Sequence, residues 1–160
     1  MSEDANNERE LPHNHLYQVL LPTIFIIIWF LDSQLFQFST ILNQYVPLVI
    51  RFIGFALILV TALFFIYSSH QAIFKSNTPS NTLIREGVFK YTRNPMYFGI
   101  LLIYISLIAL SLSLVSIGVF FFVFLAYNKI ADYEGTILED LFGDEYVKYK
   151  SEVSKWIPLP

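Results

Sequence analysis

Two long stretches of the chain are almost free of charged side chains. Between Asp32 and Lys75 the only Asp, Glu, Lys or Arg is Arg51, and between Arg93 and Lys129 there is none. Charged residues make up 14% of the chain and hydrophobic residues 55%, whereas a soluble domain carries about 25% charged residues. Helices formed by these stretches would have too few charged side chains to form a surface that faces water. The sequence therefore predicts an all-α integral membrane protein with several membrane-spanning helices.

The first half of the chain contains two candidate spans. A membrane helix needs roughly 20 mostly apolar residues, because about 30 Å of hydrocarbon is crossed at about 1.5 Å per residue. The run from Tyr17 to Phe38 meets this length, and we end its span near Leu31 because Asp32 follows. The second span is expected at 47–67.

The apolar region at 95–127 is too long for a single span. Its interruption, LSLSLVS, predicts a very tight turn between helices at about 95–112 and 114–133. We therefore expect about four transmembrane helices, of which the last two form a tight hairpin. Asp32 and Arg51 are expected to pair near the outer face.

The basic residues fall almost entirely on one side of such a four-helix arrangement, and only Arg51 lies near the other side. Because cytoplasmic loops are enriched in Lys and Arg, we expect both termini and the loop at 68–94 in the cytoplasm. The N-terminus lacks the basic segment of a signal peptide, so the first span is expected to be retained. The basic residues on the cytoplasmic side are Arg9, Lys75, Arg85, Lys90, Arg93, Lys129, Lys148, Lys150 and Lys155.

The C-terminal segment TILEDLFGDEYVKYKSEVSKWIPLP is too polar for a span. Its apolar residues recur at mostly helical spacing, which predicts an amphipathic interfacial helix broken near Phe142-Gly143. We interpret residues 1–160 as a single membrane domain. It comprises a polar tail at 1–15, two helices and the start of a loop at 16–79, and a core at 80–158.

Cysteine and histidine limit the chemistry of the chain. There is no cysteine, which excludes disulfides, thiolate catalysis and cysteine-ligated metals. The three histidines, His13, His15 and His70, show no pattern typical of a metal site, so no metal is expected.

The segment KYTRNPMYFG, residues 90–99, has two interpretations. Asn is a favoured N-cap and Pro a favoured first helical residue, so Asn94-Pro95 would simply begin a span, with Arg93 as an interfacial anchor. Alternatively the segment belongs to a site. Gly87 permits close approach of a ligand to the backbone, and a tight hairpin returns Glu134 to the membrane depth of Arg93. A polar, aromatic tail follows at once, which favours a polar pocket at the headgroup level.

Two motifs in this part of the chain resemble the motifs of a known family. The order G-x-x-x-Y-x-R-N-P-M-Y-x-G, then a hairpin, then E-x-x-x-L-x-x-x-F-G-D-E-Y-x-x-Y-K-x-x-V-x-x-W-I-P, is similar to the isoprenylcysteine carboxyl methyltransferases. It also resembles the phospholipid methyltransferases that share their core. The resemblance covers roughly residues 80–158. The matching positions are Gly87, Tyr91, Arg93, Asn94, Pro95, Tyr97, Gly99, Glu134, Leu138, Phe142, Gly143, Tyr146, Tyr149, Val153 and Pro158.

The resemblance implies an integral membrane enzyme that uses S-adenosylmethionine without a Rossmann domain. Arg93 and Asn94 would contact the cofactor's amino-acid end, and Glu134 would lie beside the cofactor or the methyl acceptor. Arg93, Asn94 and Glu134 are thus the candidate catalytic residues. The candidate cofactor-binding residues are Gly87, Tyr91, Arg93, Asn94, Pro95, Tyr97, Gly99, Glu134, Tyr146 and Tyr149.

The chain departs from the family pattern at three positions. Many relatives have His where this chain has Asn94, and they often have Glu-Glu where this chain has Glu134-Gly135. They also carry an Arg about three turns before the Phe-Gly pair, where the nearest basic residue here is Lys129. Arg and Lys are not interchangeable at a bidentate contact, so handling of the substrate is expected to differ.

The expected partners are the lipid bilayer and an amphiphilic or small hydrophobic substrate, with no nucleic acid. The sequence leaves the acceptor open among a carboxylate, a thiol and an amine; only the last two must lose a proton. Two other functions stay open, an NADPH-dependent membrane reductase of the sterol reductase type and a membrane scaffold without catalysis.

Overall fold

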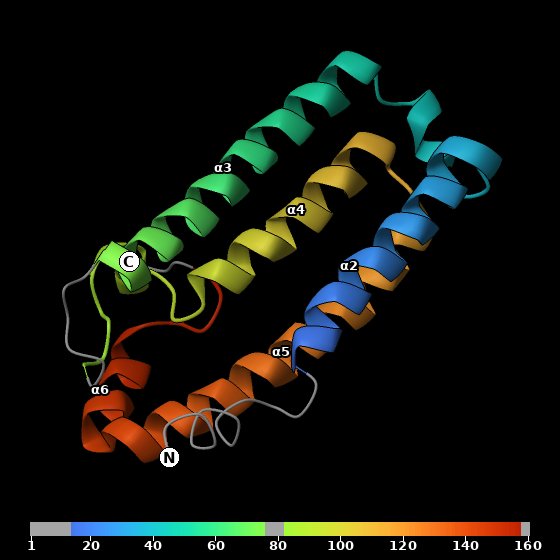
Figure 1. The fold of residues 1–160 in the computed structure, drawn as a ribbon. Coiled ribbons are helices and arrows are strands. Elements are labelled where there is room, and N and C mark those ends of the chain that lie inside the picture. Colours follow the sequence, from blue (N-terminus) through green and yellow to red (C-terminus); the bar gives the residue numbers. More distant parts are fainter. Residues whose placement is uncertain (1–13, 76–81, 158–160) are drawn as a thin grey trace. The chain divides into compact units, whose positions relative to one another are not determined.

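The computed structural model describes residues 14–75 and 82–157 (Figure 1). The predicted polar tail, apart from its last residues, and Pro158 lie outside these ranges. All regular elements of the described chain are helical, and the described residues form no strand. The elements in order are α2 (Asn14–Phe30), the π-helical turn η1 (Leu31–Phe36), the 3-10 turn η2 (Ile41–Gln44), α3 (Leu48–Lys75), the 3-10 turn η3 (Gly87–Lys90), α4 (Pro95–Ser111), α5 (Leu114–Phe142) and α6 (Asp144–Glu152).

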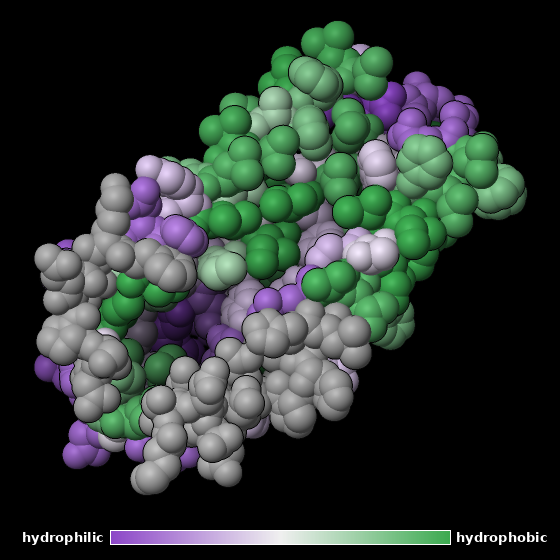
Figure 2. All heavy atoms as spheres, in the orientation of Figure 1, coloured by the Kyte–Doolittle hydropathy of each residue, from purple (hydrophilic) through white to green (hydrophobic). Residues whose placement is uncertain are grey.

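Three described helical segments are long and apolar enough to cross a membrane, and α4 is a shorter apolar helix. The long segments are Tyr17–Phe36, Leu48–Ile73 and Leu114–Phe142, and Figure 2 shows apolar side chains gathered over the helices. The prediction of an all-helical membrane protein is thereby confirmed. The hairpin is confirmed too, because only Leu112 and Ser113 separate α4 from α5, and Leu112 takes a positive φ of 47°.

Two helices are longer than the sequence predicted. The α3 helix continues to Lys75 instead of ending at 67, and α5 continues to Phe142 instead of ending at 133. Backbone hydrogen bonding continues past the end of an apolar run until a breaker residue occurs. No Pro or Gly follows Gly54 within α3. The α5 helix stops at Gly143, whose φ is 54°, so the predicted break at Phe142-Gly143 is correct.

The chain divides into two compact units. The first comprises the described part of Met1–Ala56 together with Tyr104–Glu134, and the second comprises the described parts of Leu57–Ile103 and Gly135–Pro160.

A buried carboxylate organises the start of α5 in the first unit. Asp32 is 5% exposed, and its Oδ2 atom accepts hydrogen bonds of 2.5 Å from the hydroxyls of Ser39 and Ser113. Ser113 Oγ accepts the N–H of Ser116 at 2.9 Å, which is an N-cap contact. Ser39 Oγ accepts the N–H of Val115 at 3.0 Å. The negative charge thus lies at a helix N-terminus, where it is favourable.

Arg51 has partners of its own in this unit. Its Nη1 atom donates to Asn43 Oδ1 at 2.7 Å and to the backbone oxygen of Leu110 at 2.9 Å. The predicted pairing of Asp32 with Arg51 is therefore replaced by separate contacts for each side chain. Serine hydroxyls thus contact Asp32, whereas Asn43 and a backbone oxygen contact Arg51, whose Nε atom has no hydrogen-bond partner in the described chain.

Close packing of α4 on α3 supports the candidate site in the second unit. A Cβ atom built on Gly99 would lie 2.7 Å from Ile66 Cγ1 and 2.8 Å from the backbone oxygen of Ala62. The rings of Phe65 and Phe98 meet edge to face at 5.0 Å. Gly99 therefore lets the two helices approach closely, and this approach fixes the position of the residues just before α4.

Candidate active site

The start of α4 follows the predicted pattern. The backbone oxygen of Asn94 accepts the N–H of Phe98 at 2.9 Å, so Asn94 is the N-cap and Pro95 is the first helical residue. The N–H of Asn94 donates to Thr92 Oγ1 at 3.3 Å, and Thr92 is fully buried. The site interpretation and the simple helix-start interpretation are thus compatible.

The C-terminal tail is hydrogen-bonded directly to this helix start. The backbone N–H of Arg93 donates to the oxygen of Ser154 at 3.0 Å. The backbone oxygen of Lys155 accepts Thr92 Oγ1 at 3.0 Å and Asn94 Nδ2 at 3.2 Å. One N–H of the Asn94 side-chain amide is engaged in this way, and its side-chain oxygen Oδ1 can accept from a ligand.

Two tyrosines of α6 pack against the segment that precedes α4. Tyr146 and Tyr149 are 3% and 4% exposed and form a small core with Leu83. The hydroxyl of Tyr149 donates to the backbone oxygen of Phe89 at 2.7 Å. Burial raises the pKa of Tyr149 to about 12, and the neighbouring Arg93 lowers it only in part. Tyr149 therefore stays a neutral hydrogen-bond donor at physiological pH.

Arg85 attaches α6 to the segment that precedes α4. Its Nη2 atom contacts the backbone oxygen of Glu145 at 2.6 Å and the Glu145 carboxylate at 3.0 Å. Its guanidinium lies 5.6 Å from the centre of the Tyr149 ring, within cation–π range. Arg85 was not predicted as a site residue, because no motif in the sequence links it to a residue that lies far along the chain.

These elements enclose a cavity of about 330 Å³, within the range of roughly 300–1,000 Å³ typical of small-molecule sites. Among its described lining residues only Arg93 carries a full charge, and the Arg93 Nε atom is buried without a hydrogen-bond partner in the described chain. Such a buried donor is costly unless a ligand or water satisfies it. The lining residues are Ile73, Thr82, Leu83, Ile84, Phe89, Arg93, Asn94, Gly135, Leu138, Leu141, Phe142, Tyr146 and Tyr149.

Gly135 gives the departure from the Glu-Glu pattern a structural reason. A Cβ atom at this position would lie 3.1 Å from the hydroxyl oxygen of Tyr146. That contact is closer than ordinary packing, so a larger residue here would push Tyr146 away from α5. A glycine at 135 therefore lets Tyr146 form one wall of the cavity.

Comparison with family models assigns residues 49–145, more than half of the chain, to the family described as Phospholipid methyltransferase. The chain belongs to the phospholipid methyltransferase family. Comparisons with curated proteins and with solved structures found no match. The chain is thus a membrane-type member of a methyltransferase family, as the two motifs predicted. The matched region contains Arg93, Asn94 and Gly135 and ends just before Tyr146.

The structure places the sequence-predicted site residues in two groups. Arg93, Asn94, Tyr146 and Tyr149 line one cavity, although they come from positions far apart in the chain. The other predicted residues do not line this cavity. Gly87 and Tyr91 line neighbouring cavities, and Pro95 and Tyr97 are buried in the first turn of α4. Gly99 packs on α3, and Glu134 precedes the lining residue Gly135.

Several residues that line this cavity were not predicted from the sequence as site residues. Phe89, Leu138 and Phe142 supply much of the apolar wall. Leu138 and Phe142 were positions of the family motif, which was the available signal. Nothing in the sequence distinguishes Phe89 from the other aromatics.

Proposed function

We propose that this protein transfers a methyl group from S-adenosylmethionine to an amphiphilic or lipid-like acceptor at the cytoplasmic face of a membrane. The observation that supports this most directly is the cavity of about 330 Å³. There the charged Arg93 and the polar Asn94 face two buried tyrosines. Membership of the phospholipid methyltransferase family supports the reaction class.

The residues that line the cavity fit the proposed cofactor. Arg93 would pair with its carboxylate, and a guanidinium can do so with two hydrogen bonds. The carbonyl oxygen of Asn94 would accept from its ammonium. The rings of Phe89, Tyr146 and Tyr149 offer flat faces for adenine and for the positive sulfonium.

When bound, S-adenosylmethionine supplies an activated methyl group. The task of the protein is therefore alignment, since an in-line displacement gains most from correct placement of its reactants. The tail contacts of Arg93 and Asn94, and the contacts between α6 and Arg85, would hold the cavity walls in place. The apolar wall of Leu138 and Phe142 would exclude water. Glu134 is proposed to lie beside the cofactor or the acceptor.

The cytoplasmic assignment rests on charge. Arg85, Lys90 and Arg93 all lie in the segment that forms this site, and basic residues are enriched on the cytoplasmic side of membrane proteins. The proposed topology places both termini on that side.

Isothermal titration of nanodisc-reconstituted protein with S-adenosylhomocysteine tests the proposal. We expect micromolar-range binding by the wild type and a loss of about 10- to 100-fold for Arg93→Gln, because a charged hydrogen-bonded contact contributes about 1.5–3 kcal/mol. Lys148→Gln removes an exposed charge from α6 and serves as the matched control with unchanged affinity.

Two results would contradict the proposal. One is a well-folded wild type that binds no S-adenosylhomocysteine; binding of NADPH in its place would support the reductase alternative. The other is an Arg93→Gln variant that binds as tightly as the wild type.

A further inference from the structure

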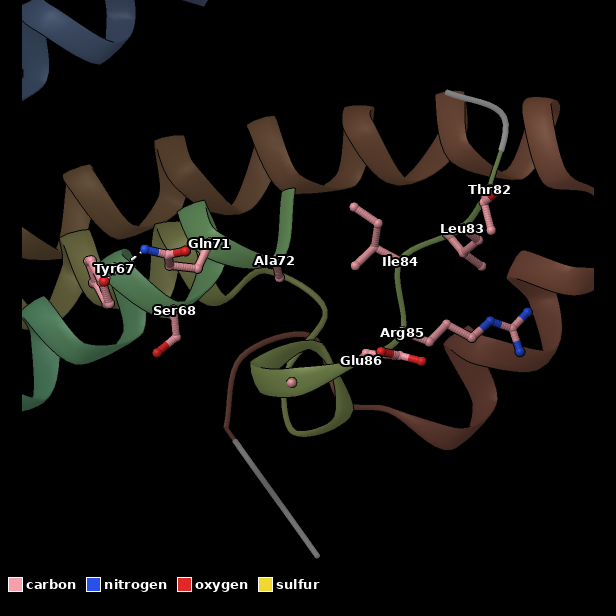
Figure 3. Close-up of a pocket in the computed structure, with 10 residues that line it drawn as sticks. Tyr67, Ser68, Gln71, Ala72, Thr82, Leu83, Ile84, Arg85 and Glu86 are labelled. Carbon is pink, nitrogen blue, oxygen red and sulfur yellow. Dashed lines mark hydrogen bonds between the residues drawn. The ribbon is translucent and has the colours of Figure 1, made fainter. Parts of the chain in front are cut away.

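Two separate attachments hold the C-terminal part of the second unit against the chain that leads into α4. The first joins the start of α6 to the segment Thr82–Glu86, which lies beside a cavity of about 710 Å³ (Figure 3). In Figure 3 Arg85 extends from this segment away from the labelled side chains of α3, and it binds Glu145. The second attachment joins the tail that follows α6 to residues 92–94. Along the chain, the two tyrosines of α6 that line the cofactor cavity lie between these attachments.

The second attachment consists of two consecutive backbone carbonyls and three consecutive residues. The oxygen of Ser154 accepts the backbone N–H of Arg93 at 3.0 Å. The oxygen of Lys155 accepts Thr92 Oγ1 at 3.0 Å and Asn94 Nδ2 at 3.2 Å, so both of its lone pairs are used. The tail contributes backbone groups alone to these contacts. Their geometry therefore depends on the donors at 92–94.

The hydroxyl of Thr92 links the tail to the first residue of the helix start. It donates to the Lys155 oxygen and accepts the backbone N–H of Asn94 at 3.3 Å, which one hydroxyl can do because it has one donor and two lone pairs. Thr92 is 0% exposed, so water cannot replace either contact and losing them is costly. Thr92 is not among the described residues that line the cofactor cavity. Its effect on a ligand must therefore pass through its neighbours.

Asn94 is the neighbour that depends most on this hydroxyl. Thr92 binds the backbone N–H of Asn94, and it also binds the Lys155 carbonyl that the Asn94 side chain contacts. Because the amide nitrogen of Asn94 must face that carbonyl, the orientation of the amide group is set, and Oδ1 lies on its opposite branch. A displaced carbonyl would release the amide to rotate. The direction of the one acceptor that Asn94 offers to the cavity is thus fixed from outside the cavity.

We propose that Thr92 is a positioning residue for S-adenosylmethionine. Its hydroxyl holds the tail and Asn94 in the arrangement in which Asn94 Oδ1 and the Arg93 guanidinium meet the cofactor. Thr92 acts through these two residues and does not touch the cofactor itself. This role rests on the proposed function.

Thr92→Val tests the role, because it keeps the shape of the side chain and removes the hydroxyl. Full-length protein in nanodiscs is titrated with S-adenosylhomocysteine below the melting transition. We expect binding about 5- to 50-fold weaker than that of the wild type, since two buried hydrogen bonds are lost and a buried N–H is left without a partner. Thr92→Ser retains the hydroxyl and restores most of the affinity. Thr61→Val is the matched control with unchanged affinity, because it removes an exposed threonine hydroxyl of α3.

Hydrogen exchange separates positioning from a general loss of stability. The backbone N–H of Arg93 donates to Ser154, so its exchange rate reports whether the tail is docked. Thr92→Val speeds this exchange about tenfold or more and leaves the amides of α3 as in the wild type. The losses of affinity from Thr92→Val and Asn94→Ala are less than additive in the double variant, because both side chains bind the same carbonyl.

The outcomes distinguish this inference from the proposed function. If the wild type binds S-adenosylhomocysteine and Thr92→Val binds it as tightly, the role of Thr92 is wrong and the cofactor site stands. Faster exchange throughout α3 in Thr92→Val, without rescue by Thr92→Ser, also overturns the role, because it shows a general structural defect. Failure of the wild type to bind S-adenosylhomocysteine contradicts the proposed function itself, and exchange at Arg93 then still decides whether Thr92 holds the tail.

Discussion

Gly99→Ala tests the close approach of α4 to α3. The added Cβ would lie 2.7 Å from Ile66 Cγ1 and 2.8 Å from the backbone oxygen of Ala62. The Ile66 side chain can rotate, but a carbonyl oxygen within a helix cannot move alone, so the two helices must separate by several tenths of an ångström. Gly54→Ala in α3 is a matched control, because its Cβ would meet no neighbouring atom within 4 Å.

The expected difference in stability between the two variants follows from two free-energy terms. Alanine is more favourable than glycine in a helix by about 1 kcal/mol, and this gain is common to both variants. Overpacking costs about 1–3 kcal/mol and applies to Gly99→Ala alone. The propensity term cancels in the comparison, so Gly99→Ala is expected to melt about 2–12 °C below Gly54→Ala in a protein of this size.

Thermal unfolding of both variants in the same detergent measures this difference. S-adenosylhomocysteine titration below the melting transition then shows whether the helix start at Arg93 and Asn94 has moved, with weaker binding expected for Gly99→Ala. Equal melting temperatures for the two variants would refute the packing argument. A large loss of binding with no loss of stability would instead place Gly99 beside the cofactor, as the family resemblance implied.

Three further predictions concern other parts of the structure. Gly135→Ala should leave the melting temperature within about 2 °C, because the helix gain offsets the contact with Tyr146, but weaken S-adenosylhomocysteine binding about threefold or more; unchanged binding would contradict it. Ser113→Ala should lower the free energy of unfolding by about 1–3 kcal/mol, since it removes a helix cap and a donor to Asp32; a thermal melt equal to the wild type would argue against it. Because the pKa of Tyr149 is raised to about 12, its stabilising effect is complete below about pH 10 and is lost as pH rises through about 12. Unfolding measured at about pH 9 and about pH 12 should therefore show a steeper loss for the wild type than for Tyr149→Phe, and parallel losses would contradict the prediction.

The sequence predicted those features that depend on local composition. Runs without charge identified the membrane helices, Asn94-Pro95 marked the start of α4, and Gly143 marked the end of α5. It placed the ends of α3 and α5 too early, because the end of an apolar run is not the end of backbone hydrogen bonding. Gly143 ends α5 well beyond its apolar run, and α3, which has no Pro or Gly after Gly54, extends to Lys75.

By itself the sequence determined the class of the protein, its hairpin and, through two short motifs, its methyltransferase family. Only the tertiary structure decided which motif residues share a cavity. Arg93, Asn94, Tyr146 and Tyr149 line one space, whereas Gly99 of the same motif packs on α3. Contacts such as Arg85 with Glu145 join residues that are distant along the chain. Such contacts depend on the separation and direction of side chains after folding, which neither periodicity nor spacing encodes.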